Sequence, residues 1–182
     1  MQKNNYKEHP LFLLYTGDGK GKTTAAMGLL FRTLGHGGEV AVIQYIKPSS
    51  LQTGEKTMAK KLGVLWENYG SGFLWEKEDE TERQQLFDRA WERTKELVLS
   101  ETYDLIILDE ITYLLNQHYI NESDFLSFFS QFKLKERKTH IVFTGRGASE
   151  PFIELCDLVS SVQEVKHPFK SEQIDSQVMI EF

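Results

Sequence analysis

The sequence predicts an α/β fold in which a mostly parallel β-sheet is covered by helices on both faces. Short apolar runs of strand length alternate with longer segments of helical periodicity, an order typical of parallel βαβ units. Three of the apolar runs are followed directly by polar clusters, TGDGKGKTT, DE and TGRG. Ligands bind at the carboxyl ends of such strands, so these clusters are expected to converge on one edge. No repeat or linker interrupts the pattern, and we expect a single domain over residues 1–182.

The first part of the chain predicts a strand, a loop, a helix and a second strand. Residues 11–15 (LFLLY) form a continuous apolar run, as expected for a strand buried on both faces. After a glycine-rich loop, residues 23–34 (TTAAMGLLFRTL) carry apolar side chains on one helical face. The glycines of residues 35–38 suit a helix C-terminus, and residues 39–46 (EVAVIQYI) predict the next strand.

The middle of the chain is less regular. We expect a polar loop, a short helix, a short strand, an irregular segment and a long helix, at residues 47–56, 57–62, 64–68, 69–79 and 79–100. The long helix is the strongest of these, because apolar residues recur along one face. Asp79 and Glu82 also have the spacing of a capping box at its start.

The last part returns to the alternating pattern. Strands are expected at 104–108, 139–145 and 158–165, and helices at 123–132 and 147–156. The aromatic side chains of residues 123–132 have helical spacing and indicate core packing rather than a cofactor site.

Composition narrows the class of protein. The chain has 40% hydrophobic and 26% charged residues, as in globular domains. Its formal net charge is −6, which argues against nucleic-acid binding, since that function usually needs a basic face. Cys156 is the only cysteine, which excludes an internal disulfide and a cysteine-based zinc site. No apolar run approaches transmembrane length and the N-terminus lacks an export signal, so we expect a cytoplasmic protein with no membrane partner.

The stretch YTGDGKGKTTAA, residues 15–26, has the character of a phosphate-binding loop. It matches G-x-x-x-x-G-K-[ST] except that Thr16 occupies the first glycine position. Its glycines let backbone N–H groups turn inward around phosphate oxygens, and the N-terminus of the following helix adds positive partial charge. We expect Lys22 to reach phosphate oxygens and Thr23 to hold Mg²⁺. The expected nucleotide-binding residues are Thr16, Gly17, Asp18, Gly19, Lys20, Gly21, Lys22, Thr23, Thr24 and Arg146.

The other two clusters, DE and TGRG, supply a candidate metal site and a positively charged side chain that can bind phosphate. Asp109 and Glu110 follow the run DLIIL, and one carboxylate there can bind the metal directly or through water. We therefore expect Thr23, Asp109 and Glu110 at the metal. Arg146 can reach triphosphate oxygens, because its planar fork suits phosphate. The residues alone thus predict a Mg-nucleotide-binding domain of the P-loop NTPase (RecA-like) type, and they do not choose its reaction.

Two other functions use the same parts. A small-molecule or nucleoside kinase would transfer the γ-phosphoryl group, with Glu110 as a candidate base. The single cysteine excludes the zinc lasso of some such kinases. A non-catalytic nucleotide switch or a nucleic-acid motor would do no small-molecule chemistry, and the acidic charge balance counts against it.

Several stretches together carry a more specific signal. YTGDGKGKTTAAMGLLFRTLGHG is followed by VAVIQYIK, then by GSGFLWE, LDEITYLLNQHYI, HIVFTGRG and VKHPF, from about residue 11 to about residue 169. In this order they resemble the P-loop corrinoid adenosyltransferases, the cob(I)alamin or cob(I)yrinic acid a,c-diamide adenosyltransferase family. Threonine before the first loop glycine is also the form found in that family.

The resemblance implies adenosyl transfer in cobalamin biosynthesis or salvage. In these enzymes Co(I) of a corrinoid attacks C5′ of the ATP ribose, and inorganic triphosphate leaves. Because Co(I) is a strong nucleophile, the protein needs only to orient C5′ and to stabilise charge on the triphosphate. The loop amides, Lys22, Mg²⁺ on Thr23, and the pair Asp109 and Glu110 can supply that stabilisation.

The resemblance also implies a corrinoid site and partners. Phe73 and Trp75 would cover the lower face of the corrin ring and keep an axial ligand off cobalt, which eases reduction of Co(II) to Co(I). With Lys22 they are the expected catalytic residues, and Tyr113 and Asn116 are expected to contact the corrinoid. A reducing flavoprotein and a homodimer are implied as well.

The C-terminal tail departs from the family pattern. Relatives usually carry a lysine and a glycine in an A-Q-x-G-like context, whereas this chain reads KSEQIDSQVMIEF. Asp175 stands where the lysine would be and Met179 where the glycine would be. If the tail touches the nucleotide or the corrinoid, substrate preference is expected to differ. The sequence does not choose among cobyrinic acid diamide, cobinamide and cobalamin.

Overall fold

A six-stranded parallel sheet forms the centre of the protein. The computed structural model describes residues 10–48, 50–70, 79–134 and 138–180. The strands are β1 Phe12–Thr16, β2 Val40–Pro48, β3 Leu65–Gly70, β4 Leu105–Asp109, β5 His140–Thr144 and β6 Leu158–Ser161. They lie in the order β3-β2-β4-β5-β1-β6, and every pair of neighbouring strands is parallel. The predicted α/β class with a P-loop-type sheet is confirmed.

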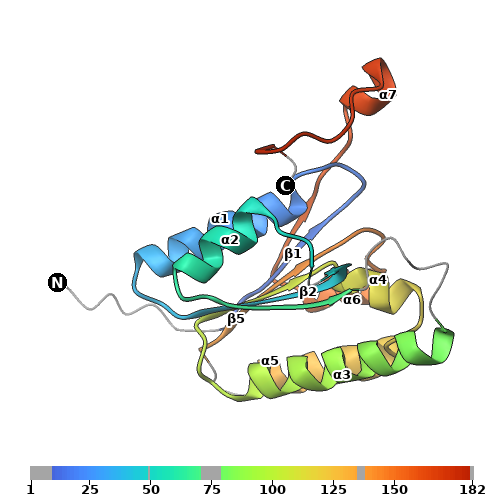
Figure 1. Cartoon of the computed structure of the whole chain (residues 1–182). Coiled ribbons are helices and arrows are strands. Elements are labelled where there is room, and N and C mark those ends of the chain that lie inside the picture. Colours follow the sequence, from blue (N-terminus) through green and yellow to red (C-terminus); the bar gives the residue numbers. More distant parts are fainter. Residues whose placement is uncertain (1–9, 49, 71–78, 135–137, 181–182) are drawn as a thin grey trace.

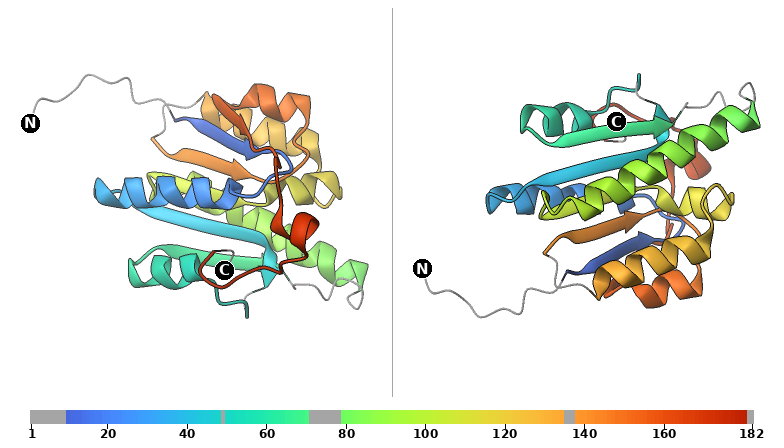
Figure 2. Two further views of the ribbon diagram at one scale, coloured as in Figure 1. Left: turned by 90° about the horizontal axis from the view of Figure 1, so that it is seen from above. Right: turned by 90° about the horizontal axis from the view of Figure 1, so that it is seen from below.

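Helices cover both faces of this sheet (Figures 1 and 2). They are α1 Lys22–Gly35, α2 Gly54–Lys61, α3 Glu80–Leu99, α4 Ile111–Asn116, α5 Glu122–Lys133, α6 Glu150–Leu155 and α7 Pro168–Glu172. The two views of Figure 2 show α1 and α2 on one face and α3 and α5 on the other. None of the helices in the described parts of the chain is long and apolar enough to cross a membrane.

Each face of the sheet has its own apolar core. On the α1 face, Ala26 and Leu30 pack against Val42, Ile107 and Val142. On the opposite face, side chains of α3, α4, α5 and α6 pack against the alternate residues of the same strands. The strands alternate between the two cores because successive side chains point to opposite faces. Strands buried on both sides therefore read as the continuous apolar runs seen in the sequence.

Several predicted boundaries were wrong. The polar segment 47–56 is not all loop, because β2 runs to Pro48 and α2 already begins at Gly54. The side chain of Thr53 accepts a hydrogen bond from the N–H of Lys56, a cap that starts the helix earlier than predicted. The last strand ends at Ser161 rather than at residue 165. Helices α4 and α7 were not predicted, since five or six residues give too few turns for a periodic pattern.

Helix α3 begins at the predicted N-cap residue, but the hydrogen bond goes to Thr81 and not to Glu82 as in a capping box. Asp79 lies at the N-cap in an extended conformation, and its side chain accepts a hydrogen bond from the N–H of Thr81 at 3.0 Å. The predicted irregular segment 69–79 is different: residues 69 and 70 belong to β3, and residues 71–78 lie outside the described residues.

Candidate functional site

The loop between β1 and α1 is held against the chain that follows β6. The N–H of Gly19 donates to the carbonyl of Val162 at 2.8 Å, and the N–H of Val162 donates to the carbonyl of Thr16 at 2.8 Å. A Cβ on Gly17 would lie 2.5 Å from the Val162 oxygen, and one on Gly19 would lie 2.6 Å from the Gln163 oxygen. Neither position has room for a side chain, so the glycines are required by close backbone approach.

Lys22 lies at the start of α1 with its ammonium group turned into this loop. Its side chain is only 5% exposed, and Nζ donates to the carbonyls of Gly17 at 2.8 Å and Gly19 at 2.7 Å. Burial lowers the pKa of Lys22, and the nearby charge of Arg146 lowers it further. The ammonium therefore lies among the loop carbonyls, beside the loop amides that the sequence assigned to phosphate.

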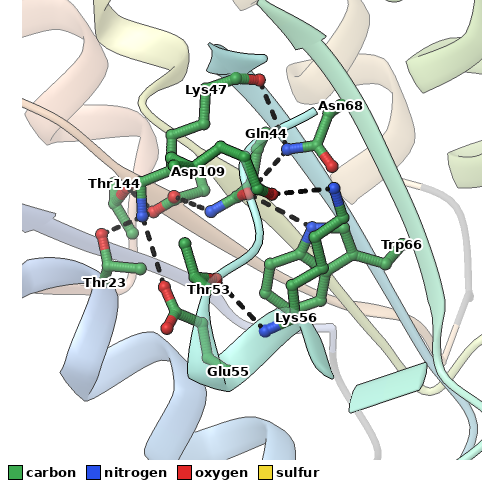
Figure 3. Close-up of polar contacts among 11 residues, drawn as sticks. Thr23, Gln44, Lys47, Thr53, Glu55, Lys56, Trp66, Asn68, Asp109 and Thr144 are labelled. Carbon is green, nitrogen blue, oxygen red and sulfur yellow. Dashed lines mark hydrogen bonds and ion pairs between the residues drawn. The ribbon is translucent and has the colours of Figure 1, made fainter. Parts of the chain in front are cut away.

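Asp109, the last residue of β4, is buried below the loop (Figure 3). The hydroxyls of Thr23 and Thr144 donate to its Oδ1 at 2.9 and 2.8 Å, and the amide of Gln44 donates to its Oδ2 at 2.9 Å. These donors come from α1, β5 and β2. The strand ends predicted to converge do so at this carboxylate.

Glu110 follows Asp109 in a left-handed conformation, with φ of 65°. Its N–H donates to the hydroxyl of Thr144 at 2.9 Å. A non-glycine residue at such a φ is uncommon, and the neighbouring hydrogen bonds hold it there. Burial raises the pKa of the Glu110 carboxyl, and the negative charge of Asp109 raises it further.

These oxygen atoms fit a magnesium ion that also binds phosphate. Within the described ranges no group of three or more His, Cys, Asp or Glu side chains could hold a metal by itself. The Thr23 hydroxyl and the Asp109 carboxylate, 2.9 Å apart, are the hard oxygen ligands that Mg²⁺ prefers. Mg²⁺ at nucleotide sites commonly takes one or two protein oxygens and the rest from phosphate and water. The donor set suits that arrangement and not a dedicated metal cage.

Arg146 projects from the loop after β5. Its Nη1 lies 3.7 Å from Oδ1 of Asp18, and both side chains are more than half exposed, so this ion pair is weak. The amide of Asn116, at the end of α4, donates to the Arg146 carbonyl at 3.0 Å and holds this loop. Tyr113 instead packs against the core and stacks on Tyr119 with ring centroids 6.4 Å apart.

A cavity of about 500 Å³ opens above the loop, within the size range of small-molecule sites. Its lining contains most of the predicted nucleotide residues and Glu110. The full lining is Gly19, Lys20, Gly21, Lys22, Thr23, Thr24, Met27, Lys47, Gly54, Glu55, Glu110, Arg146, Met179 and Ile180. Gly17 and Asp18 line a second hollow of about 600 Å³, together with Arg146 and the chain after β6. Thr16 ends β1 and is 8% exposed.

Several residues of the site were not predicted. Lys47 and Glu55 form an ion pair of 3.3 Å on the cavity wall. Lys47 lies near the carboxyl end of β2, so the rule that located Asp109 and Arg146 applied to it as well. Met179 and Ile180 bring the divergent tail to the cavity. Phe73 and Trp75, predicted to contact the corrinoid, lie outside the described residues.

Comparison with known proteins decides which of the candidate functions this site serves. A family model described as ATP:corrinoid adenosyltransferase BtuR/CobO/CobP matches residues 8–182. The chain belongs to this family. It is therefore a transferase with ATP and a corrinoid as substrates, and nothing in the comparisons favours a kinase or a switch domain.

Individual relatives support the same assignment. A corrinoid adenosyltransferase of Sinorhizobium is 40% identical, covering 96% of this chain and 81% of the relative. Proteins of the same name from Escherichia coli K12 and Salmonella typhimurium LT2 are 30% and 33% identical, covering 96% and 90% of this chain and 87% and 81% of the relatives. The flagellar accessory protein FlaH of Methanocaldococcus jannaschii has a similar fold, with a TM-score of 0.56, 15% identity, and coverage of 85% of this chain and 71% of that structure. At that identity the likeness shows the fold alone.

Proposed function

We propose that the cavity binds MgATP with its triphosphate on loop 17–21, and that the 5′-deoxyadenosyl group passes to Co(I) of a corrinoid. In this step the Co–C5′ bond forms from the cobalt electron pair, while the C5′–O bond breaks and its electrons leave on inorganic triphosphate. Cobalt is formally oxidised from Co(I) to Co(III). The observation that carries the proposal is the gathering of Lys22, Thr23 and Arg146 in the lining of one cavity of about 500 Å³.

Each group has a role in stabilising the leaving triphosphate. Lys22 would donate to phosphate oxygens in place of its two loop carbonyls, and Arg146 adds a second positive charge from the loop after β5. Thr23 and Asp109 would hold Mg²⁺, which supplies further positive charge when bound. No side chain needs to act as nucleophile or base, so Glu110 serves as a carboxylate at the metal site rather than as a kinase base.

The corrinoid contacts form the second half of the proposal. Phe73 and Trp75 would cover the lower corrin face, with Tyr113 and Asn116 near the ring. The position of Asn116 beside the Arg146 loop supports a corrinoid above the carboxyl edge of the sheet. We further propose a single domain over residues 1–182, a homodimer, a cytoplasmic location and a reducing flavoprotein as the electron source.

One anaerobic incubation tests the reaction. ATP, Mg²⁺ and chemically reduced cobalamin are mixed with the protein, and both the phosphate product and the cobalt species are analysed. Stoichiometric triphosphate with a light-sensitive adenosyl–cobalt product would support the proposal. Corrinoid-independent release of ADP and phosphate would show that the loop serves phosphoryl transfer.

The aromatic residues need a separate comparison. Phe73→Ala and Trp75→Ala are expected to slow turnover from Co(II) more than turnover from chemically supplied Co(I), because only the first needs the axial ligand removed. Equal losses in the two assays would contradict the proposed role on the lower corrin face.

A further inference from the structure

A row of hydrogen-bonded polar side chains crosses the carboxyl edge of the sheet (Figure 3). Asn68 of β3, Gln44 of β2 and Asp109 of β4 are direct neighbours in the strand register, and Thr144 of β5 comes next. Asn68 Nδ2 donates to Gln44 Oε1 at 2.8 Å, and Gln44 Nε2 donates to Asp109 Oδ2 at 2.9 Å. We call Asn68, Gln44, Asp109 and Thr144 the polar row.

The amide of Gln44 has one acceptable orientation. Its side chain is 1% exposed, and its Oε1 accepts hydrogen bonds from Asn68 and from the indole N–H of Trp66 at 3.2 Å. An indole nitrogen can only donate. A flipped amide would turn its NH₂ group toward those two donors and its oxygen toward the carboxylate of Asp109. The neighbours therefore fix the Gln44 N–H on Asp109.

This orientation in turn fixes the carboxylate of Asp109. Gln44 donates to Oδ2 of Asp109, so that Oδ1 faces the hydroxyls of Thr23 and Thr144. The terminal torsion of an aspartate is otherwise broad, so without Gln44 the carboxylate would have a wider range of orientations. Groups that orient metal ligands in this way commonly change metal affinity by about 10–100-fold when removed.

We propose that Gln44 is a positioning residue that holds Asp109 for the Mg²⁺ of MgATP. The inference rests on the proposed function, in which Thr23 and Asp109 hold that ion. Gln44 itself need touch neither nucleotide nor metal, since it is buried beneath the site and acts through Asp109. Its effect is therefore confined to binding that depends on Mg²⁺, whereas the loop amides and Lys22 bind phosphate with or without the metal.

Calorimetric titration with ATP, once with Mg²⁺ and once with EDTA, tests this inference. Gln44→Met keeps the length of the side chain and removes the donor to Asp109. We expect it to raise the Kd for ATP about tenfold in Mg²⁺, and by less than about twofold in EDTA. Asn68→Ala, at a half-buried position, only loosens the Gln44 amide, and we expect about a threefold rise in Mg²⁺.

Tyr45→Phe is the matched control on the same strand. Tyr45 faces the other side of β2, and its hydroxyl forms a buried hydrogen bond of 2.6 Å with Thr94. The substitution removes a buried hydrogen bond as Gln44→Met does, yet we expect both Kd values to stay at the wild-type level. Circular dichroism on each variant confirms that it is folded at the titration temperature.

The outcomes separate the inference from the proposed function. If wild-type binding depends on Mg²⁺ and Gln44→Met shifts both Kd values equally or not at all, the positioning role is overturned and the proposed function stands. If wild-type binding is indifferent to Mg²⁺, the metal assignment and the inference both fail. If Gln44→Met does not fold, Asn68→Ala decides, and an unchanged Kd in Mg²⁺ overturns the inference.

Discussion

Gly19→Ala tests whether the packing of the phosphate loop against the chain after β6 sets its shape. The new Cβ would lie 2.6 Å from the Gln163 oxygen, whereas ordinary contacts begin at 3.4 Å, so the loop has to move by 3.4 − 2.6 = 0.8 Å. That movement breaks the hydrogen bond from the Gly19 N–H to Val162, which contributes about 1 kcal/mol. The midpoint of thermal unfolding should fall by about 2–4 °C. A misplacement of about 1 Å at a reacting site can cost about 100-fold in rate, and we expect a loss of that order in triphosphate release.

Gly28→Ala is the control for this variant. Gly28 lies within α1, and a Cβ there would meet nothing within 4 Å. Alanine in a helix interior is more stable than glycine by about 0.5–1 kcal/mol, so this variant should unfold at a slightly higher temperature and keep its turnover. The reasoning is refuted if Gly19→Ala binds MgATP within twofold of wild type and releases triphosphate at the wild-type rate.

Four further predictions concern single residues. Lys22→Ala should slow triphosphate release at least about 100-fold, because a donor to the leaving group is lost; normal turnover would remove Lys22 from the mechanism. Met179→Gly should raise the KM for ATP about fivefold, because it removes apolar surface worth about 1 kcal/mol from the cavity. It should not lower the unfolding temperature, because glycine relieves the strain of a residue at φ of 74°. An unchanged KM would show that Met179 takes no part in nucleotide binding. His140 Nδ1 accepts a hydrogen bond from the N–H of Leu11 at 3.0 Å, and burial lowers the His140 pKa. As the pH falls, the unfolded chain therefore binds a proton at His140 before the folded protein does, and the free energy of unfolding should decrease below about pH 6.5. Urea unfolding of His140→Gln should show a flatter dependence of this free energy on pH, and a dependence identical to wild type would contradict the argument. Burial raises the pKa of Cys156 to about 12, so a disulfide reagent at pH 8 should label the folded protein much more slowly than the chain in urea, and equal rates would disprove the burial argument.

The strand ends that carry the site were predictable because buried parallel strands have a simple sequence signature. LFLLY and DLIIL are continuous apolar runs, and a polar residue directly after such a run marks the carboxyl edge where ligands bind. Thr23, Asp109 and Thr144 come from three separate runs, and the structure joins them within 2.9 Å. A parallel sheet brings these strand ends to one edge, and the order β4-β5-β1 makes them neighbours there.

Gln44 could not be predicted as a partner of Asp109 in the same way. It lies within EVAVIQYI, and its contacts depend on which strands are neighbours and on their register. A single sequence gives no direct information on the order of the strands or on their register. The position of the tail could not be predicted either, because the chain after residue 161 shows neither helical nor strand periodicity. Only the tertiary structure brings Met179 and Ile180 to the cavity.

The site is continuous with one of the two cores, and this bears on how it functions. Along β2, Val40 and Val42 face the core beneath α1, and Gln44 is the next residue on that face. Along β4, Leu105 and Ile107 lead in the same way to Asp109. Asp109, a ligand of the proposed metal, and Gln44, which positions it, therefore continue packed rows, and close packing lets them move little. A reaction in which the substrate brings its own nucleophile needs fixed charges and fixed orientation from the protein, and such rows supply both.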